Sequence, residues 1–283
     1  MEILQHVATP LSSSTIVIAA KTDSAYGRSE SNNDFDYKVL MIQRNALGTF
    51  KNASVFPGGI VDSADEDTTW QEMYPHLNNK KGLLSHRICA IRETFEESGV
   101  LLVENHGAGL TLQELEKWRK IVSYIFLNAF IYLTCSIFIK STISSQVHND
   151  ASQLYHLCNK YDLRPLVEPL LPLGHWITPQ KFPRRFDTLF FLVTLTSVPF
   201  ASADLEETTQ LHWFTPSEAL RAFEREEIKL YPPQLATLLQ LVDVKRWNML
   251  YASFRDKAET IVEELGASEE YEHGHPANGT ARL

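Results

Sequence analysis

The segment 92–100, Arg-Glu-Thr-Phe-Glu-Glu-Ser-Gly-Val, places three carboxylates within five residues. Apolar residues three and four positions apart in 84–98 predict an amphipathic helix here, and the glycine that follows predicts its end. On such a helix Glu93 lies one turn from both Glu96 and Glu97, so the three carboxylates share one face. Because like charges at this spacing repel, the face is either a solvated acidic surface or the site of a cation.

Two glycine features beside the acids favour the cation: the pair Gly58-Gly59 upstream, and Gly99, which ends the helix just after the acids. Hard divalent cations take oxygen ligands, and Mg²⁺ commonly combines a few carboxylates with substrate phosphates. Arg92 directly precedes Glu93 and can orient the acids or neutralise part of their charge. Upstream, Gly58 and Gly59 predict a turn whose backbone a phosphate or the helix can approach closely.

Composition limits the class of partner. The chain of 283 residues has 26 Lys and Arg against 35 Asp and Glu, a net charge of −9, which argues against a general binder of nucleic acid or anionic membranes. A hydrophobic fraction of 44% excludes a wholly disordered chain. Cys89, Cys135 and Cys158 are too scattered for a disulfide framework or a zinc cluster and are typical of an intracellular protein. The first residues lack the basic and apolar regions of a secretory signal.

The wider pattern predicts an α/β domain with a helical insertion and a helical C-terminal part. Strands are expected at 14–20, 37–43, 188–196 and 211–214, with the first two paired. Helices are expected at 110–121 and 151–159, after Thr215-Pro216, and from Pro232 to about Leu265. The acidic stretch 62–72 is expected to be a loop.

The glycines and the acidic helix together resemble the Nudix box, the signature of hydrolases that split a diphosphate linked to another moiety. Gly59 matches the first glycine and 92–100 the second half, with Thr94 in an aliphatic position. Asp65 takes the first acidic position, and 26 residues separate it from the second half where the plain box has seven. The resemblance implies an α/β/α sandwich with a mixed sheet over residues 8–265, with an insertion inside the box and extra C-terminal helices.

The resemblance also implies a mechanism. Mg²⁺ or Mn²⁺ ions held by Glu93, Glu96 and Glu97 would bridge the diphosphate oxygens and lower the pKa of an attacking water. Arg92 would serve the same catalytic site. Either Glu96 or Glu207 would act as the general base.

The interruption of the box points to a substrate, because it is similar to that of the acyl-coenzyme A diphosphatases within the Nudix family. The segments that share this similarity are 39–44, 55–59, 184–188, 213–219 and 230–234. The implied reaction splits coenzyme A or acyl-CoA into 3′,5′-ADP and (acyl-)4′-phosphopantetheine. The alternatives are a dinucleotide or nucleotide-sugar substrate, and a Nudix-fold binding module without catalysis.

Several residues are candidates for binding this substrate. Gly58 and Gly59 would approach its diphosphate. Arg184 and Arg185 are adjacent at the start of an expected strand, and guanidinium groups suit phosphate recognition, although a solvated turn explains them equally well. Arg44 ends a strand before the glycines and could reach a phosphate or form a surface ion pair.

The C-terminal end is similar to a peroxisomal address. Ala281, Arg282 and Leu283 are a small, a basic and an aliphatic residue, at the end of a segment, 266–283, that is expected to be disordered. The expected partner is therefore the peroxisomal import receptor and the expected location the peroxisomal matrix, with cytoplasm or mitochondrion as alternatives.

The run 121–139 is apolar and has no charge. Its length suits a membrane span, but a span would interrupt what resembles a single domain. A buried helix is a second interpretation. The third is a retained intron covering 122–146, because Val122-Ser123 and Gln146 are what splice-site sequences encode in frame. We favour the intron, which predicts a transcript 75 nucleotides (25 codons) shorter; only full-length product across this junction would reject it.

Overall fold

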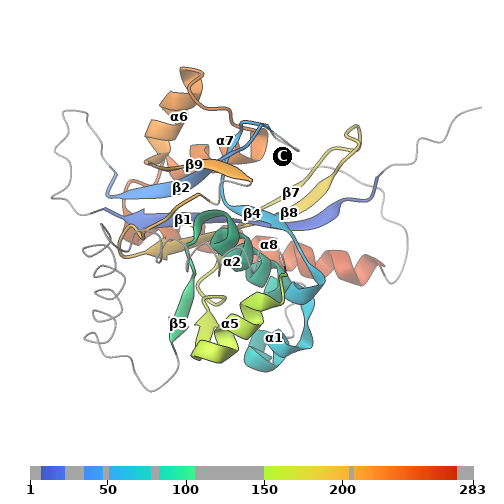
Figure 1. Ribbon diagram of the computed structural model, residues 1–283. Coiled ribbons are helices and arrows are strands. Elements are labelled where there is room, and N and C mark those ends of the chain that lie inside the picture. Colours follow the sequence, from blue (N-terminus) through green and yellow to red (C-terminus); the bar gives the residue numbers. More distant parts are fainter. Residues whose placement is uncertain are drawn as a thin grey trace, which may run out of the picture.

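The computed structural model describes residues 8–22, 35–46, 51–77, 83–105, 150–203 and 207–272. In these residues a mixed sheet lies between helices on its two faces (Figure 1), which confirms the expected α/β/α sandwich. The expected helix at 110–121, the apolar run with segment 122–146, and residues 281–283 lie outside the described residues. Across the described residues, no helix has both the length and the apolar character needed to cross a membrane.

The seven-stranded sheet is organised around β1 (Leu11–Lys21). This strand pairs antiparallel with β2 (Tyr37–Arg44) and parallel with β8 (Phe186–Leu195). The main path of the sheet is β3-β2-β1-β8-β7, while β4 pairs with β1 and β9 pairs with β2. The remaining strands of the sheet are β3 (Ser54–Val55), β4 (Gly58–Ile60), β7 (Leu171–Ile177) and β9 (Thr208–Phe214).

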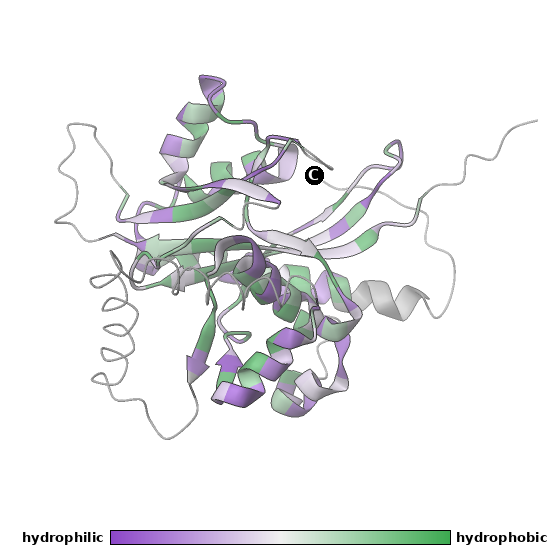
Figure 2. Ribbon diagram, in the orientation of Figure 1, coloured by the Kyte–Doolittle hydropathy of each residue, from purple (hydrophilic) through white to green (hydrophobic). Residues whose placement is uncertain are grey.

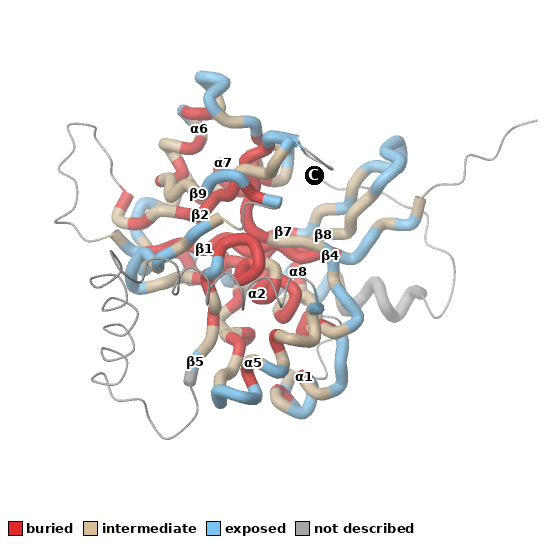
Figure 3. Tube along the Cα trace, in the orientation of Figure 1, coloured by how far each residue is buried: buried red, intermediate tan, exposed pale blue. Residues whose placement is uncertain are grey.

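The middle of β1 is covered on both faces. Ile16, Val17 and Ile18 are completely buried, which suits β-branched residues in a central strand. Ile16 and Ile18 belong to the core on the face covered by α2, and Val17 belongs to the core on the opposite face. Figure 2 shows hydrophobic residues concentrated in the central strands, and Figure 3 shows buried residues in these strands and along α2.

Helices from distant parts of the chain cover the two faces. The core on one face contains residues of α1 (Thr68–Met73), α2 (Leu83–Ser98) and α5 (Gln153–Tyr161). The core on the other face contains residues of α6 (Pro216–Glu224) and α7 (Pro232–Leu241). Helix α8 (Leu250–Glu272) packs against β7 and contributes to both cores. A separate two-stranded sheet joins β5 (Val103–Asn105) to β6 (Leu163–Pro165).

The structure confirms the expected helix at the box and both of its ends. Helix α2 spans the predicted segment, and Gly99 follows it with a φ of 68°, the left-handed conformation that glycine adopts readily. Helix α6 also begins as expected: Thr215 and Glu218 form a reciprocal capping box around Pro216. The strands expected at 14–20, 37–43, 188–196 and 211–214 are all present, within a few residues of their predicted bounds.

Three local expectations were wrong. Gly58 and Gly59 form strand β4 rather than a turn, because their backbone pairs with Ser14 and Thr15 of β1. The acidic stretch 62–72 contains a 3₁₀ turn (Ser63–Glu66) and the start of α1, because aspartate side chains cap both elements. The helical region expected from Pro232 to about Leu265 is divided into two helices, α7 and α8, and α8 continues to Glu272.

Candidate active site

Arg92 lies at the centre of a buried group of carboxylates. It is 4% exposed, and its Nε and Nη2 donate to the two carboxylate oxygens of Asp65 at 2.9 and 2.8 Å. This two-pronged pair joins the two halves of the interrupted box, which are 26 residues apart in the chain. The two halves of the box therefore meet at Arg92 in spite of the insertion.

The remaining donors of Arg92 hold the acids of its own helix. Nη1 donates to Oε1 of Glu93 at 2.9 Å and to Oε1 of Glu96 at 3.0 Å, and Nη2 also donates to the carbonyl of Ile60 at 3.0 Å. All five N–H groups of the guanidinium thus have acceptors. Arg92 orients the carboxylates, and no donor is left over for a substrate.

Gly59 brings β4 against α2 at the box. A Cβ atom added at Gly59 would lie 2.3 Å from Cδ of Glu93, so only glycine leaves room for this carboxylate. Gly58 is equally confined, since an added Cβ would lie 2.2 Å from the carbonyl oxygen of Ser14. Its N–H donates to Oε2 of Glu97 at 2.9 Å. The two glycines therefore position two of the three carboxylates.

We predict that Gly59→Ala lowers kcat/KM for any diphosphate substrate about 10²-fold, because the new methyl group displaces Glu93. Steady-state kinetics with purified protein would measure this. Gly174→Ala is the matched control: its Cβ would lie 3.3 Å from Nε1 of Trp176 and 3.9 Å from Cβ of Phe190, away from the carboxylates, and activity should persist. Full activity in Gly59→Ala would contradict the close packing of Glu93 against β4.

Arg44 and Glu207 complete the site from the ends of the paired strands β2 and β9. Nη2 of Arg44 donates to Oε2 of Glu207 at 2.9 Å, and Nη1 lies 3.5 Å from Oε1 of Glu97. Glu207 directly precedes β9, and its backbone carbonyl accepts from the N–H of Asn45 at 2.9 Å. Thr208 donates its hydroxyl to the carbonyl of Glu97 at 3.2 Å. The strand pair β2–β9 thus carries Glu207 to the box.

Burial controls the ionisation of this cluster. Desolvation raises the pKa of Glu93 to about 7 in spite of the nearby Arg92. Desolvation, with the charge of Glu93 in addition, raises the pKa of Glu97 well above its ordinary value. Burial by itself lowers the pKa of Arg92, but the Asp65 hydrogen bond and the charge of Glu93 outweigh it, so the guanidinium stays charged. The carboxylates therefore need more positive charge than the arginines supply.

This donor set fits a divalent cation. Five carboxylates surround two guanidiniums, a formal charge of −3 when all are ionised; the acids are Asp65, Glu93, Glu96, Glu97 and Glu207. A set of ligands made only of carboxylate oxygens suits Mg²⁺ or Mn²⁺. Among the described side chains, no three His, Cys, Asp or Glu are gathered as a metal site, since the acids face Arg92, Arg44 and the Gly58 amide. The assignment of Glu93, Glu96 and Glu97 as ligands stays a prediction.

Arg184 and Arg185 belong to a different part of the structure. They lie at the start of β8, where Arg185 donates to the carbonyls of Thr178 and Ala8, both at 2.9 Å. Arg184 stacks over the ring of Phe186 at 5.3 Å. These contacts tie the β7–β8 hairpin together, and none of them joins the carboxylate cluster. Their role in substrate binding stays a prediction.

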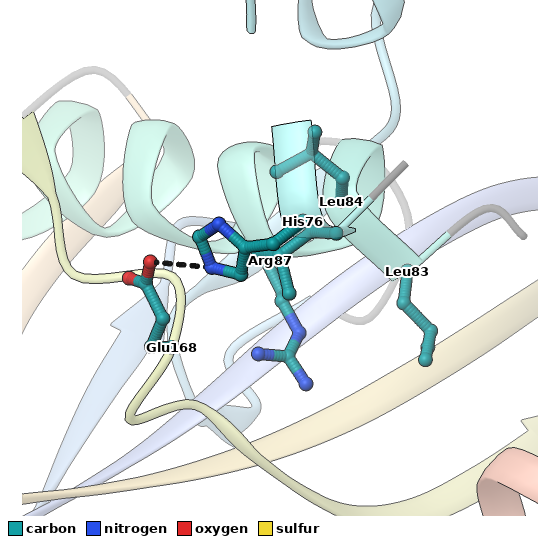
Figure 4. Close-up of a pocket in the computed structure, with 6 residues that line it drawn as sticks. His76, Leu83, Leu84, Arg87 and Glu168 are labelled. Atoms are coloured by element: carbon teal, nitrogen blue, oxygen red, sulfur yellow. Dashed lines mark ion pairs between the residues drawn. The ribbon is translucent and has the colours of Figure 1, made fainter. Parts of the chain in front are cut away.

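A pocket lies at the N-terminal end of α2, away from the carboxylates (Figure 4). It is lined by His76, Leu77, Leu83, Leu84, Arg87 and Glu168. His76 and Glu168 form an ion pair of 3.1 Å, and the guanidinium of Arg87 donates to the carbonyl of Val167. The pocket contains none of the acids of the box, so the candidate active site rests on the cluster around Arg92.

Sequence reasoning missed the contacts that assemble this cluster. The Gly58 amide that holds Glu97 and the Thr208 hydroxyl that docks β9 on α2 have no local sequence signal. Cys89 was also missed: it lies under β4, with its Sγ 3.7 Å from the carbonyl of Gly59. Cys89 lies three residues before Arg92, and this spacing alone places the two side chains on the same face of the helix.

Comparison with known proteins agrees with this geometry. The model of the NUDT19 Nudix domain matches residues 11–85 and 135–241 of this chain, and the acidic part of the box, 92–100, lies between these two segments. The acyl-coenzyme A diphosphatase NUDT19 of Xenopus laevis is 29% identical over 84% of this chain and 70% of its own length. The human protein of the same name is 28% identical over 73% of this chain and 61% of its own length.

The fold is shared with a solved structure. A Nudix hydrolase from Alicyclobacillus acidocaldarius superposes with a TM-score of 0.62 at 19% identity, and the match covers 86% of this chain and 96% of that one. Together with the closed box around Arg92, the family match leads to one conclusion. The chain belongs to the NUDT19 Nudix domain family and is a Nudix hydrolase.

Proposed function

We propose that this chain hydrolyses the diphosphate bond of coenzyme A and acyl-CoA, giving 3′,5′-ADP and (acyl-)4′-phosphopantetheine. The observation that carries the proposal is the Arg92 network: one guanidinium holds Asp65, Glu93 and Glu96 in fixed positions, across a 26-residue interruption. Such a network is needed for positioned carboxylates and not for a solvated acidic face. The relatives named acyl-coenzyme A diphosphatase support the choice of substrate.

The residues of the site divide the chemistry between them. Glu93, Glu96 and Glu97 would hold Mg²⁺ or Mn²⁺, which supplies charge stabilisation for the diphosphate and acidifies an attacking water. Arg92 fixes the orientation of Glu93 and Glu96. Gly58 and Gly59 let β4 pack closely against β1 and against Glu93, which keeps these acids in place, and their contact with a diphosphate stays a prediction.

Glu207 is the better placed of the two candidate bases. Its side chain is 47% exposed, so a solvent water can reach it. The side chain of Glu96 is 5% exposed, so a solvent water reaches it less readily; because each of the two acids accepts from an arginine, exposure is what separates them. We therefore assign proton removal from the attacking water to Glu207.

A turnover assay tests the proposal. Purified protein is incubated with coenzyme A and Mg²⁺ or Mn²⁺, and 3′,5′-ADP is measured by chromatography, with EDTA as the metal-free control. Parallel reactions contain an acyl-CoA, a dinucleotide or a nucleotide sugar. The proposal requires metal-dependent release of 3′,5′-ADP with coenzyme A or acyl-CoA preferred. Preference for another substrate would redirect the assignment within the diphosphatases, and no turnover at all would indicate a binding module.

A further inference from the structure

The Arg44 side chain links the two parts of the candidate site, helix α2 and the β2–β9 strand pair. It is the last residue of β2, and its side chain, 25% exposed, reaches Glu207 before β9 and Glu97 on α2. The two contacts are unequal. The distance to Glu207 is 2.9 Å, a well-formed ion pair, whereas the distance to Glu97 is 3.5 Å.

Glu97 depends on Arg44 for its charge balance. Its side chain is 2% exposed, and one of its oxygens accepts from the Gly58 amide at 2.9 Å. The other oxygen faces Arg44. In the part of the chain that the structure describes, Arg92 pairs with Asp65, Glu93 and Glu96 and leaves Glu97 to Arg44. Arg44 therefore supplies positive charge at the position of a predicted metal ligand.

We propose that Arg44 is an exchangeable counterion. In the metal-free protein it neutralises Glu97; when a divalent cation binds, Arg44 gives up Glu97, keeps its contact with Glu207 and directs its freed N–H groups to the substrate diphosphate. The proposal rests on the proposed function, because it requires that a divalent cation and a diphosphate bind here. The long contact to Glu97 is the one that separates easily, and the short contact to Glu207 keeps the guanidinium in place.

The exchange has consequences of opposite sign for the two ligands. Because Arg44 competes with the cation for Glu97, its removal should strengthen metal binding in the absence of substrate. Because Arg44 then contacts the diphosphate, its removal should weaken substrate binding. A residue that only stabilises the site predicts that both become weaker. The two roles are therefore distinguishable in one variant.

The test is Arg44→Gln, with Mn²⁺ alone as the first probe and coenzyme A as the second. Mn²⁺ affinity is measured by calorimetry and by the Mn²⁺-dependent rise in Tm. We expect Mn²⁺ to bind the variant about three- to fivefold more tightly than the wild type, the range that a partly exposed ion pair allows. The Tm rise should be larger, and KM for coenzyme A should increase at least about tenfold.

Two further variants make the result interpretable. Arg225→Gln is the matched control, because Arg225 is an exposed arginine with an acidic neighbour, Glu227, on a helix end away from the box. It should leave Mn²⁺ affinity and KM unchanged. Arg44→Lys keeps the charge but not the forked donors, so Mn²⁺ affinity should stay within about twofold of the wild type while KM still rises. It also keeps the proposal testable if Arg44→Gln does not fold, since tighter metal binding by the lysine variant would contradict it.

The outcomes separate this inference from the proposed function. If the wild type binds Mn²⁺ and hydrolyses coenzyme A, but Arg44→Gln binds Mn²⁺ equally or more weakly, the counterion exchange is wrong and the function stands. An unchanged KM would likewise reject the contact with the diphosphate. If the wild type neither binds Mn²⁺ nor hydrolyses coenzyme A, the proposed function fails first.

Discussion

Glu97→Gln should fold normally and lose Mg²⁺-dependent hydrolysis, with kcat/KM lowered at least about 10³-fold, equivalent to about 4 kcal/mol of transition-state stabilisation. The fold should persist because the amide oxygen of glutamine can still accept from the Gly58 N–H. The variant also removes an unfavourable buried group, since desolvation and the charge of Glu93 both raise the pKa of Glu97 in the wild type. What it loses is an ionised oxygen ligand for the metal.

Single-turnover and steady-state kinetics would measure the loss, and thermal unfolding would verify the fold. Glu72→Gln is a suitable control, because Glu72 is an exposed carboxylate on α1 outside the cluster and its replacement should leave kcat/KM unchanged. Undiminished turnover by a folded Glu97→Gln protein would remove Glu97 from the metal site. A parallel loss in Glu72→Gln would mean that the assay responds to net charge instead.

Arg92→Ala should have the largest effect on stability. It leaves Asp65 and Glu96, which are buried, and Glu93, which is largely buried, without their counterion, and breaking a buried ion-pair network in this way costs about 3–5 kcal/mol of unfolding free energy. Chemical denaturation with urea, followed by circular dichroism, would measure the loss. Arg221→Ala provides the baseline, since Arg221 is exposed on α6 and its replacement should change stability by about 0.5 kcal/mol or less.

A second substitution identifies the cause. Adding Asp65→Asn to Arg92→Ala removes one of the stranded charges, so the double variant should be more stable than Arg92→Ala alone. Additive losses would show instead that the two residues act independently. Arg92→Lys should fall between the wild type and Arg92→Ala, because an ammonium keeps the charge but cannot satisfy five acceptors in a fixed plane.

Local patterns in the sequence predicted four strands of the main sheet and most of the helices. The apolar spacing of 84–98 specifies α2, and β-branched residues at 15–18 specify the buried part of β1. The errors arose where the structure of a segment depends on residues outside it, either on a distant strand or at the cap directly before a helix. Gly58 and Gly59 were taken for a turn because their pairing with β1 is invisible in the glycines themselves. The caps from Asp62 and Asp67 turned an expected loop into short helical elements.

The candidate site divides in the same way. The sequence alone determined which acids share a face of α2, because the helical repeat fixes the positions of Glu93, Glu96 and Glu97 relative to one another. Only the tertiary structure decided which partners meet that face. Asp65 reaches Arg92 across the insertion, and the pairing of β2 with β9 brings Arg44 and Glu207 together from positions 163 residues apart. Side-chain spacing within a helix is a local property of the backbone, whereas these ion pairs depend on how separate strands pack around a common core.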